Sequence, residues 1–247
     1  MVDRERRASL ATFYCEGPFG AGDILAPSDD VFNHLRARRI ADGEVVRLSD
    51  GVGHFATATS LERGKRVELH ISTIAEVEPQ PLIHLRAPIA DRDRMLWLAE
   101  KATELGVATW QGVRFRRSAS VTPRGEGDAF ANKARARMIS ALEQSGSAWL
   151  PGMLGDDDLQ SIASESSDLC VVMDPAGAPL LSVLGRDAAE GVTILVGPEG
   201  GIEDDEIAML EKAGWRRASL GASILRFETA AIAAIGVVRA AQTFLET

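Results

Sequence analysis

Cysteine and histidine are scarce in this chain of 247 residues, which limits the kinds of site it can build. The two cysteines, Cys15 and Cys170, are far apart and lie in strand-like runs. That placement argues against a disulfide framework and against a cysteine-based metal site, so we interpret both as reduced, buried thiols. The four histidines show neither HxxxH nor HxH spacing, and the sequence therefore predicts no metal centre.

Long apolar runs and the common nucleotide fingerprints are also missing. No segment reaches the roughly 18 apolar residues that a membrane helix needs. The N-terminal stretch MVDRERRASL lacks a following apolar run of signal-peptide length. We therefore expect a soluble, cytoplasmic protein with no membrane partner. Neither GxGxxG nor a P-loop motif is present, which speaks against a dinucleotide or nucleotide triphosphate site of those types.

Positive charge is scarce overall but unevenly distributed. The formal net charge is −9, yet residues 86–150 carry 11 basic and 7 acidic side chains, whereas residues 151–247 carry 6 basic and 16 acidic ones. The basic segment contains the clusters RFRR at 114–117 and KARAR at 133–137. Because phosphate contacts depend on local Lys and Arg density, this segment is a candidate RNA surface. On charge alone, an ordinary solvated helix face explains these basic clusters better than an RNA surface does.

Residues 6–74 have the pattern of a compact, barrel-like β module. Strand-like runs at 7–15, 44–51, 53–64 and 65–73 surround a short helix at 31–38 that Ser28 can cap. The pairs Asp50-Gly51 and Arg63-Gly64 indicate hairpin turns. The proline-containing stretch 75–88 is either a linker or the lead-in to the next sheet.

From residue 91 onward, helical and strand patterns alternate. Helices are expected at 91–106, 128–146, 203–214 and 228–246, and strands at 107–115, 168–175, 192–198 and 216–221. This alternation predicts a mostly parallel α/β sheet. The helix at 228–246 is apolar on every side, which requires burial either within the chain or at a subunit interface.

The turn GPEGG at 197–201 follows a buried strand and opens onto a helix. Ligands of open parallel sheets bind beyond the carboxyl ends of the strands, and the three glycines allow close approach to the backbone. A tight connection without a ligand is the alternative. Four acids, Glu203 to Glu206, occupy the positive end of the following helix dipole. They oppose a phosphate there and favour a neutral or cationic ligand such as S-adenosylmethionine.

A second loop of the same kind runs from residue 219 to 231, between a strand and the last helix. It places Arg226 and Glu228 in an otherwise apolar context. Taken alone, mutual pairing or capping of the helix by Glu228 or Thr229 is the better explanation for these polar residues.

Two motifs together resemble one enzyme family. LVGPEGGIEDDEI followed by LGASILRFETAAIAA is similar to the signature of the RsmE-type 16S ribosomal RNA uridine-N3 methyltransferases of the SPOUT class. Supporting matches are EKATELGV at 100–107, RRS at 116–118, ALEQSG at 141–146 and NHLRARRIADGE at 33–44. They cover nearly the whole chain in the family's order.

The resemblance implies an architecture and partners. It implies a PUA-like, RNA-binding β-barrel at 1–74 and a SPOUT α/β methyltransferase domain at 75–247 with a C-terminal trefoil knot. It further implies S-adenosylmethionine as methyl donor without a metal, a homodimer, and as substrate a uridine of the position-1498 type in the 16S rRNA of the 30S subunit.

It also implies roles for individual residues. Within that reaction, our hypothesis makes Arg226 and Glu228 the candidate catalytic residues, Arg226 as the cation beside the uracil and Glu228 as the base. A role of Glu228 as helix cap or partner of Arg226 is an equal alternative. RNA contacts are carried over to Arg39, Arg116, Arg117, Ser118, Glu143 and Gln144. Cofactor contacts are expected from Leu195, Val196, Gly197, Glu199, Gly200, Gly201, Leu220, Gly221, Ile224, Leu225 and Arg226.

The chain departs from the family pattern at several positions. Ala222-Ser223 stands where the family commonly has Pro-Arg, Phe227 where it has Thr, Ser147 where it has Arg, Glu100 where it has Gln, and 37–39 reads ARR rather than VLR. The cofactor turn is intact. Three other functions remain open: a SPOUT methyltransferase for a ribose 2′-hydroxyl or another base, a non-catalytic rRNA-binding assembly factor, and an unrelated nucleotide-using α/β enzyme.

Overall fold

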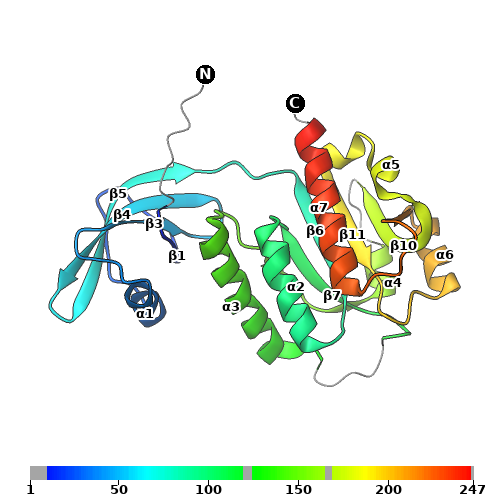
Figure 1. Ribbon diagram of the computed structural model, residues 1–247, viewed down its shortest axis with the longest axis horizontal. Coiled ribbons are helices and arrows are strands. Elements are labelled where there is room, and N and C mark those ends of the chain that lie inside the picture. The colour runs from blue at the N-terminus through cyan, green and yellow to red at the C-terminus, as the bar shows by residue number, and fades with distance from the viewer. Residues whose placement is uncertain (1–9, 119–123, 165–168, 246–247) are drawn as a thin grey trace. The chain divides into compact units, whose positions relative to one another are not determined.

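The computed structural model describes residues 10–118, 124–164 and 169–245. The chain forms two compact units (Figure 1): Met1–Pro79 together with Leu142–Leu150, and Gln80–Ala141 together with Pro151–Thr247. The segment 142–150 therefore belongs to the first unit. A single division of the chain at residue 74 assigns it to the second domain instead. Residues 7–9 of the first expected strand and residue 246 of the last expected helix lie outside the described ranges.

The first unit is a five-stranded sheet with one helix. The strand order is β1-β3-β4-β5-β2, and only the β1–β3 pairing is parallel. Both predicted hairpins are confirmed, because β3 pairs antiparallel with β4 and β4 with β5. The two-residue strand β2 has no sequence signal that indicated it. The elements are β1 (Thr12–Tyr14), β2 (Ile24–Leu25), α1 (Asp29–Ala37), β3 (Val45–Ser49), β4 (His54–Arg63) and β5 (Arg66–Glu76).

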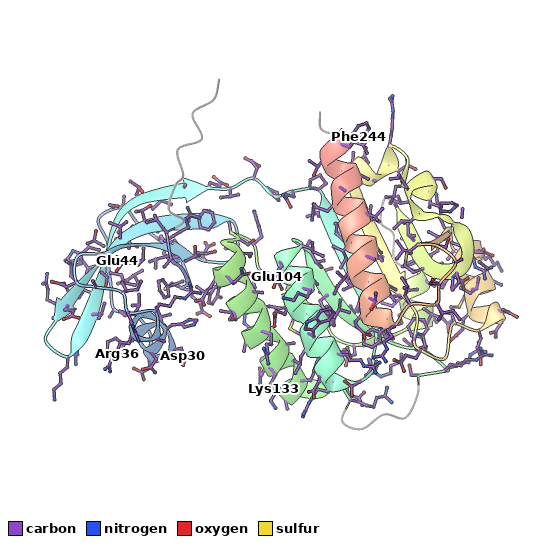
Figure 2. The ribbon with its side chains drawn as sticks, viewed as in Figure 1. Asp30, Arg36, Glu44, Glu104, Lys133 and Phe244 are labelled. Atoms are coloured by element: carbon purple, nitrogen blue, oxygen red, sulfur yellow. The ribbon has the colours of Figure 1, made fainter. Side chains whose placement is uncertain are left out.

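Helix α1 begins where the sequence predicts. The hydroxyl of Ser28 accepts a hydrogen bond from the Val31 N–H at 3.3 Å, which confirms Ser28 as the N-cap. Asp30 lies in the first turn and Arg36 in the last (Figure 2), where their charges complement the helix dipole. Leu35 is the buried residue that attaches the helix to the core of the unit.

The segment 142–150 joins the first unit through hydrogen bonds to the β3–β4 turn. The Ser49 hydroxyl donates to the carbonyl of Ser147 at 3.1 Å, and the Gly53 N–H donates to the carbonyl of Ala148 at 2.9 Å. A Cβ at position 53 would lie 2.5 Å from the Trp149 ring, so a glycine is needed there.

The second unit is built on a seven-stranded sheet whose pairings are all parallel, as predicted. The strand order is β12-β10-β11-β6-β7-β8, with β9 also paired to β7. The strands are β6 (Leu82–Pro88), β7 (Thr109–Arg114), β8 (Gly152–Met153), β9 (Asp157–Asp158), β10 (Cys170–Pro179), β11 (Gly191–Val196) and β12 (Arg216–Ser219). Strand β6 occupies half of the stretch 75–88, which is therefore a lead-in to the sheet.

Helices cover this sheet. Side chains of α4 and α6 share one apolar cluster with residues of β7, β10 and β11. Helix α7 packs on α2, β6 and β11. The short helices α4 and α5 and the 3-10 turn Asp187–Ala189 have no counterpart in the sequence pattern. The helices are α2 (Arg92–Glu104), α3 (Gly127–Ser145), α4 (Leu159–Ala163), α5 (Leu180–Leu184), α6 (Asp204–Lys212) and α7 (Phe227–Leu245).

The sheet changes direction between β6 and β11. These strands are neighbours, but the connection after β6 leads to β7 on one side and the connection after β11 leads to β12 on the other. In open α/β sheets, such a reversal leaves a crevice beyond the carboxyl ends of the two strands, and ligands bind there. Both the GPEGG turn and the segment 89–94 lie at this edge.

Helix α7 buries a single stripe rather than its whole surface. Phe227, Ala231, Ala234, Ile235 and Val238 are buried. Ile232, Ala233, Gly236 and Val237 keep partial exposure, so the expected burial on every side is not complete within one chain. Despite this apolar character, none of the helices in the described ranges could span a bilayer.

Candidate functional site

A cavity lies at the carboxyl ends of β11 and β12 and beside residues 173–175 of β10, where the pairing of that strand with β12 is irregular. Residues from three segments line it: 173–175, 196–202 and 219–227, together with Ala230 of α7. Of the expected cofactor residues, Leu195, Gly200 and Arg226 are not part of the lining. Eight do line it, namely Val196, Gly197, Glu199, Gly201, Leu220, Gly221, Ile224 and Leu225.

Backbone geometry shapes the turn at 197–201. The Gly201 N–H donates to the carbonyl of Pro198 at 2.8 Å, and Gly201 has a φ of 76°, which favours glycine. A Cβ at Gly197 would lie 2.5 Å from Cγ1 of Ile202. The glycines therefore serve the close packing of the turn as well as access to its backbone.

The cavity carries negative charge and no cation. Its ionisable lining residues are Asp174 and Glu199, and none of its lining residues is Lys or Arg. Asp174 pairs with Arg217 at 2.9 Å, whereas the side chain of Glu199 is half exposed and pairs with Arg94. A ligand with positive charge suits this lining, and a phosphate does not.

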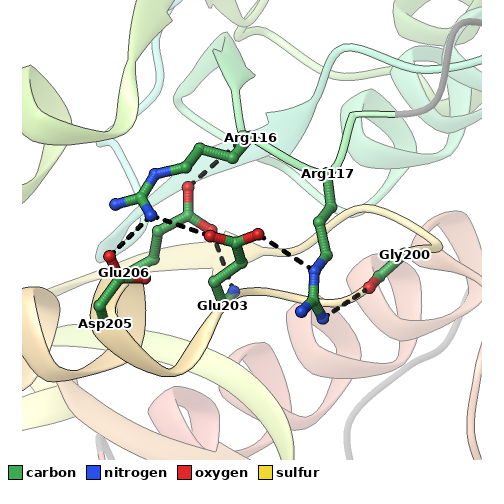
Figure 3. Close-up of polar contacts among 6 residues, drawn as sticks. All are labelled: Arg116, Arg117, Gly200, Glu203, Asp205 and Glu206. Atoms are coloured by element: carbon green, nitrogen blue, oxygen red, sulfur yellow. Dashed lines mark hydrogen bonds and ion pairs between the residues drawn. The ribbon is translucent and has the colours of Figure 1, made fainter.

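Three of the four acids at the start of α6 contact Arg116. Arg116 pairs with Glu203 at 2.8 Å and with Asp205 at 2.6 Å, and its N–H donates to Glu206 (Figure 3). The Arg116 guanidinium lowers the pKa of Asp205. Glu203 and Asp205 are thus ion-paired, as Asp174 and Glu199 of the cavity lining are. None of the four α6 acids lines the cavity, and their effect on a phosphate stays a prediction.

Arg117 connects the β7 loop to the GPEGG turn. Its Nε lies 3.3 Å from Oε1 of Glu203, and one terminal nitrogen donates to the carbonyl of Gly200 at 3.4 Å (Figure 3). A Cβ at Gly200 would lie 3.0 Å from the Arg117 carbonyl oxygen and 3.1 Å from its Cβ. Gly200 thus allows close approach of Arg117, a reason for this glycine that the sequence did not indicate.

The candidate catalytic residues do not pair with each other. Arg226 is exposed and forms no ion pair or hydrogen bond through its side chain within the described part of the chain. Glu228 is only 7% exposed, and its Oε2 has no hydrogen-bond partner among the described residues. Mutual pairing is therefore not the explanation for these two residues. A buried carboxylate oxygen without a partner is costly unless a ligand or water satisfies it.

The candidate RNA residues are divided between the two units. Arg39 and Gln144 are exposed in the first, and Arg116, Arg117 and Ser118 lie in the second. The Ser118 hydroxyl accepts from the Phe115 N–H at 3.2 Å. The guanidinium-bearing side chains of Arg116 and Arg117 are 58% and 54% exposed despite their ion pairs.

Glu143 differs from its expected role as a direct RNA contact. It is 5% exposed, accepts from the Tyr14 N–H at 2.9 Å and lies 3.0 Å from Nδ1 of His34. It therefore holds β1 and α1 together. Burial, with the Glu143 charge adding to it, raises the pKa of Cys15 to about 12, so that thiol is neutral. Both cysteines are free, and no cluster of three possible metal ligands occurs within the described ranges.

Several residues that line this cavity were not predicted from the sequence. Asp174, Pro175, Ser219, Phe227 and Ala230 line the cavity. Asp174-Pro175 follows the buried run 170–173 of β10, as the GPEGG turn follows buried β11, although β10 itself continues to Pro179. That position in the sequence was the available signal. Nothing local marks Ala230, because it is one of many alanines in α7.

Comparison with known proteins places the chain in a family. Residues 76–239 match the RNA methyltransferase domain and residues 27–69 match the RNA methyltransferase PUA domain. The chain belongs to this RNA methyltransferase family, an α/β enzyme class with an attached PUA domain.

Three individual proteins are similar to this chain over most of its length. The chain is 30% identical to the ribosomal RNA small subunit methyltransferase E of Mycobacterium tuberculosis over 238 residues, covering 87% of this chain and 85% of the relative. It is similar to the enzyme of that name from Neisseria gonorrhoeae solved with S-adenosylmethionine, with 28% identity, a TM-score of 0.82 and 95% and 98% coverage. A Legionella pneumophila protein solved with the same cofactor gives 29% identity, a TM-score of 0.80 and 94% and 98% coverage.

Proposed function

We propose that the chain is an S-adenosylmethionine-dependent methyltransferase that modifies N3 of a uridine, of the position-1498 type, in 16S rRNA. The observation that carries the proposal is the cavity at the edge of the second sheet, which is formed by two glycine-bearing loops and carries carboxylates but no cation. Family membership and relatives solved with the same methyl donor support it.

The residues of the cavity fit this donor. Its sulfonium and ammonium groups are cationic, and Asp174 and Glu199 supply the complementary charge. The turns at 197–201 and 219–221 offer backbone groups to the uncharged parts, while Ile224 and Leu225 supply apolar contact. Bound S-adenosylmethionine provides an already activated methyl group, so the protein's task is to align it with the acceptor.

The acceptor needs help from the protein because uridine N3 carries a proton and is a poor nucleophile until that proton leaves. We assign the removal of this proton to the Glu228 carboxylate, whose buried Oε2 lacks a partner within the described ranges. Arg226 provides the cation beside the carbonyl oxygen where negative charge collects.

RNA binding is assigned to both units. The PUA-like barrel over 1–74 contacts RNA through Arg39, and the segment 142–150 of the same unit does so through Gln144, while Glu143 supports the position of His34. In the domain 75–247, the exposed guanidinium groups of Arg116 and Arg117, with Ser118, contact phosphates. A salt-dependent affinity for ribosomal RNA follows from these contacts.

The remaining parts of the proposal concern assembly. We place the C-terminal loops and α7 in a SPOUT trefoil knot and assign the partly exposed stripe of α7 to a homodimer interface. That stripe continues to Phe244, which is 79% exposed (Figure 2) and would gain burial in a dimer. The enzyme would act in the cytoplasm, without a metal. Light scattering that gives 26.4 kDa for the pure protein would exclude a stable dimer.

The decisive experiment is nucleoside mass spectrometry of 16S rRNA from a deletion strain, with and without the chain restored. N3-methyluridine that appears only on restoration supports the proposal. A methylated ribose or another methylated base would indicate a different RNA target. Absence of any methyl transfer would favour a binding or assembly factor, and tight binding of ATP or NAD in the cavity without uptake of S-adenosylmethionine would favour an unrelated enzyme.

A further inference from the structure

A second cavity lies beside the first, at the reversal point of the sheet. The segment 89–91 and Arg94 line it from the end of β6, and Pro198 and Glu199 line it from the end of β11, with Phe227 between. Since neighbouring strands that connect in opposite directions create the ligand crevice of an open sheet, this is where the fold itself opens a binding site.

The two cavities share three lining residues. Pro198, Glu199 and Phe227 line both. Molecules bound in the two cavities would therefore both contact these three residues. Such adjacency is what a transfer reaction requires, because donor and acceptor atoms must come within about 3–3.5 Å of each other.

Arg94 is the cation of the second cavity. Its guanidinium pairs with Glu199, and this partner raises the pKa of Arg94, with Glu228 adding to the same effect. A guanidinium has five N–H donors, so one ion pair leaves others for a ligand. The side chain is 34% exposed, which keeps it accessible.

Two carboxylates, Asp91 and Glu199, also line this cavity, and Glu199 is the ion-pair partner of Arg94. One carboxylate oxygen of Asp91 accepts from the N–H groups of Asp93 and Arg94, both at 3.1 Å, and so caps α2. That cap also fixes the first turn of the helix, on which Arg94 stands. The remaining walls, including Ile89, Pro198 and Phe227, are apolar and suit the faces of a flat ring.

We propose that this second cavity holds the uracil ring of the acceptor nucleotide, with Arg94 donating to one of the two carbonyl oxygens that flank N3. In the transfer, the N3 proton leaves to the Glu228 carboxylate. The new bond forms between N3 and the methyl carbon as the bond from that carbon to sulfur breaks. Arg94 is then a catalytic residue that stabilises charge on the uracil as the proton leaves. The inference rests on the proposed function and adds the acceptor site to it.

Two alanines provide a matched test, because each lines only one cavity: Ala90 the second and Ala230 the first. We expect Ala90→Leu to leave the calorimetric affinity for S-adenosylmethionine within about twofold of the parent and to reduce methyl transfer to unmethylated 30S subunits by at least about 100-fold. Ala230→Leu should instead weaken S-adenosylmethionine binding. Normal kcat and KM for RNA in a folded Ala90→Leu variant would overturn the inference.

Arg94 variants test the role of the cation. Arg94→Ala frees Glu199, which lines both cavities, so S-adenosylmethionine should bind at least as tightly as in the parent. Methyl transfer should be roughly 100–1,000-fold slower at pH 7, as for loss of one donor to developing charge. The deficit should shrink at high pH, where hydroxide assists removal of the N3 proton. Arg94→Lys should recover part of the rate. A deficit that is unchanged across pH would overturn the catalytic role, because loss of structure alone would not alter the profile.

Measurements on the parent protein distinguish a failure of the proposed function from a failure of the acceptor-cavity assignment. If the parent neither binds S-adenosylmethionine nor methylates 30S subunits, the proposed function fails. If the parent does both and the Ala90 and Arg94 variants match it, only the assignment of the acceptor cavity fails. Should Ala90→Leu lose S-adenosylmethionine binding through misfolding, the pH profiles of the Arg94 variants decide.

Discussion

The Nε of Arg117 lies 3.3 Å from Oε1 of Glu203, a residue 86 positions further along the chain. The same guanidinium donates to the carbonyl of Gly200 at 3.4 Å, so one side chain connects the β7 loop to both the GPEGG turn and the start of α6. The turn that lines the cavity is therefore held from outside by an arginine that does not line the cavity itself.

This relationship predicts that Arg117→Ala and Glu203→Gln each weaken S-adenosylmethionine binding, by about two- to fivefold, because exposed ion pairs contribute roughly 0.2–1 kcal/mol. The double variant should lose less than the sum of the single losses. Isothermal titration calorimetry without RNA measures the effect. Arg114→Ala is the matched control, since Arg114 pairs with Asp156 rather than with the turn or α6. Equal affinities for all variants would remove Arg117 from the support of the turn.

Gly200→Val should also weaken S-adenosylmethionine binding, but indirectly. The new side chain would meet the Arg117 backbone, because a Cβ at this position already lies 3.0 Å from the Arg117 carbonyl oxygen. We expect at least a tenfold higher dissociation constant by calorimetry, with a smaller effect for Gly200→Ala. Undiminished affinity in the valine variant contradicts this account.

Arg226→Ala is predicted to slow methyl transfer to 30S subunits by about 100- to 1,000-fold, the usual effect of removing one donor to developing charge. Affinity for S-adenosylmethionine should change little, because Arg226 is not part of the cavity lining. Arg216→Ala, which removes a surface pair with Asp187, serves as the control. Near-normal turnover would exclude Arg226 from the mechanism.

Arg39 has a left-handed backbone, with a φ of 58°, at the position after the C-cap of α1. The hydrogen bonds from Arg39 N–H to Arg36 and from Ile40 N–H to Leu35 complete a helix end that usually has glycine there. Arg39→Gly should therefore raise the free energy of unfolding by about 0.5–1 kcal/mol while lowering RNA affinity.

The neighbouring substitution Arg38→Gly is the matched control, because it removes the same charge from a right-handed position. It should not stabilise the protein. Thermal unfolding and salt-dependent RNA binding measure the two effects separately. A less stable Arg39→Gly variant would contradict the strain argument, and unchanged RNA affinity would remove Arg39 from the RNA surface.

Asp50 predicts a dependence of stability on acid pH. Burial acts to raise the pKa of Asp50, but hydrogen bonds from the N–H groups of Val52 and His54 and from the His54 ring outweigh it and lower the pKa. The stabilisation that ionised Asp50 gives the folded protein is thus fully present above the unfolded pKa of about 3.9. It is lost as the pH falls through the lower folded pKa.

The substitution Asp50→Asn keeps an oxygen acceptor and removes the titration. We expect it to reduce the free energy of unfolding by on the order of 1–3 kcal/mol at pH 7. The difference from the parent should shrink below about pH 4 as the parent's own carboxyl takes up its proton. Urea denaturation at pH 7, 5 and 3.5 tests this, and a difference that is the same at every pH would contradict it.

Local chemistry was enough to determine much of the architecture from the sequence. Ser28 marked the start of α1, the pairs at 50–51 and 63–64 marked both hairpins, and the buried β-branched runs of β10 and β11 marked parallel strands. These features depend on residues a few positions apart, so their physical causes are visible in short stretches of sequence. The position of the GPEGG turn between a buried strand and a helix was predictable for the same reason.

Tertiary structure alone decided the contacts between distant residues. It paired Arg116 and Arg117 with the acids of α6, buried Glu143 against Tyr14 and His34, and placed 142–150 beside the β3–β4 turn. It also created the second cavity from the ends of β6 and β11, which are about a hundred positions apart. A charge or an apolar residue specifies its own preference for water or for a partner, but which partner lies within reach is set by the path of the folded chain.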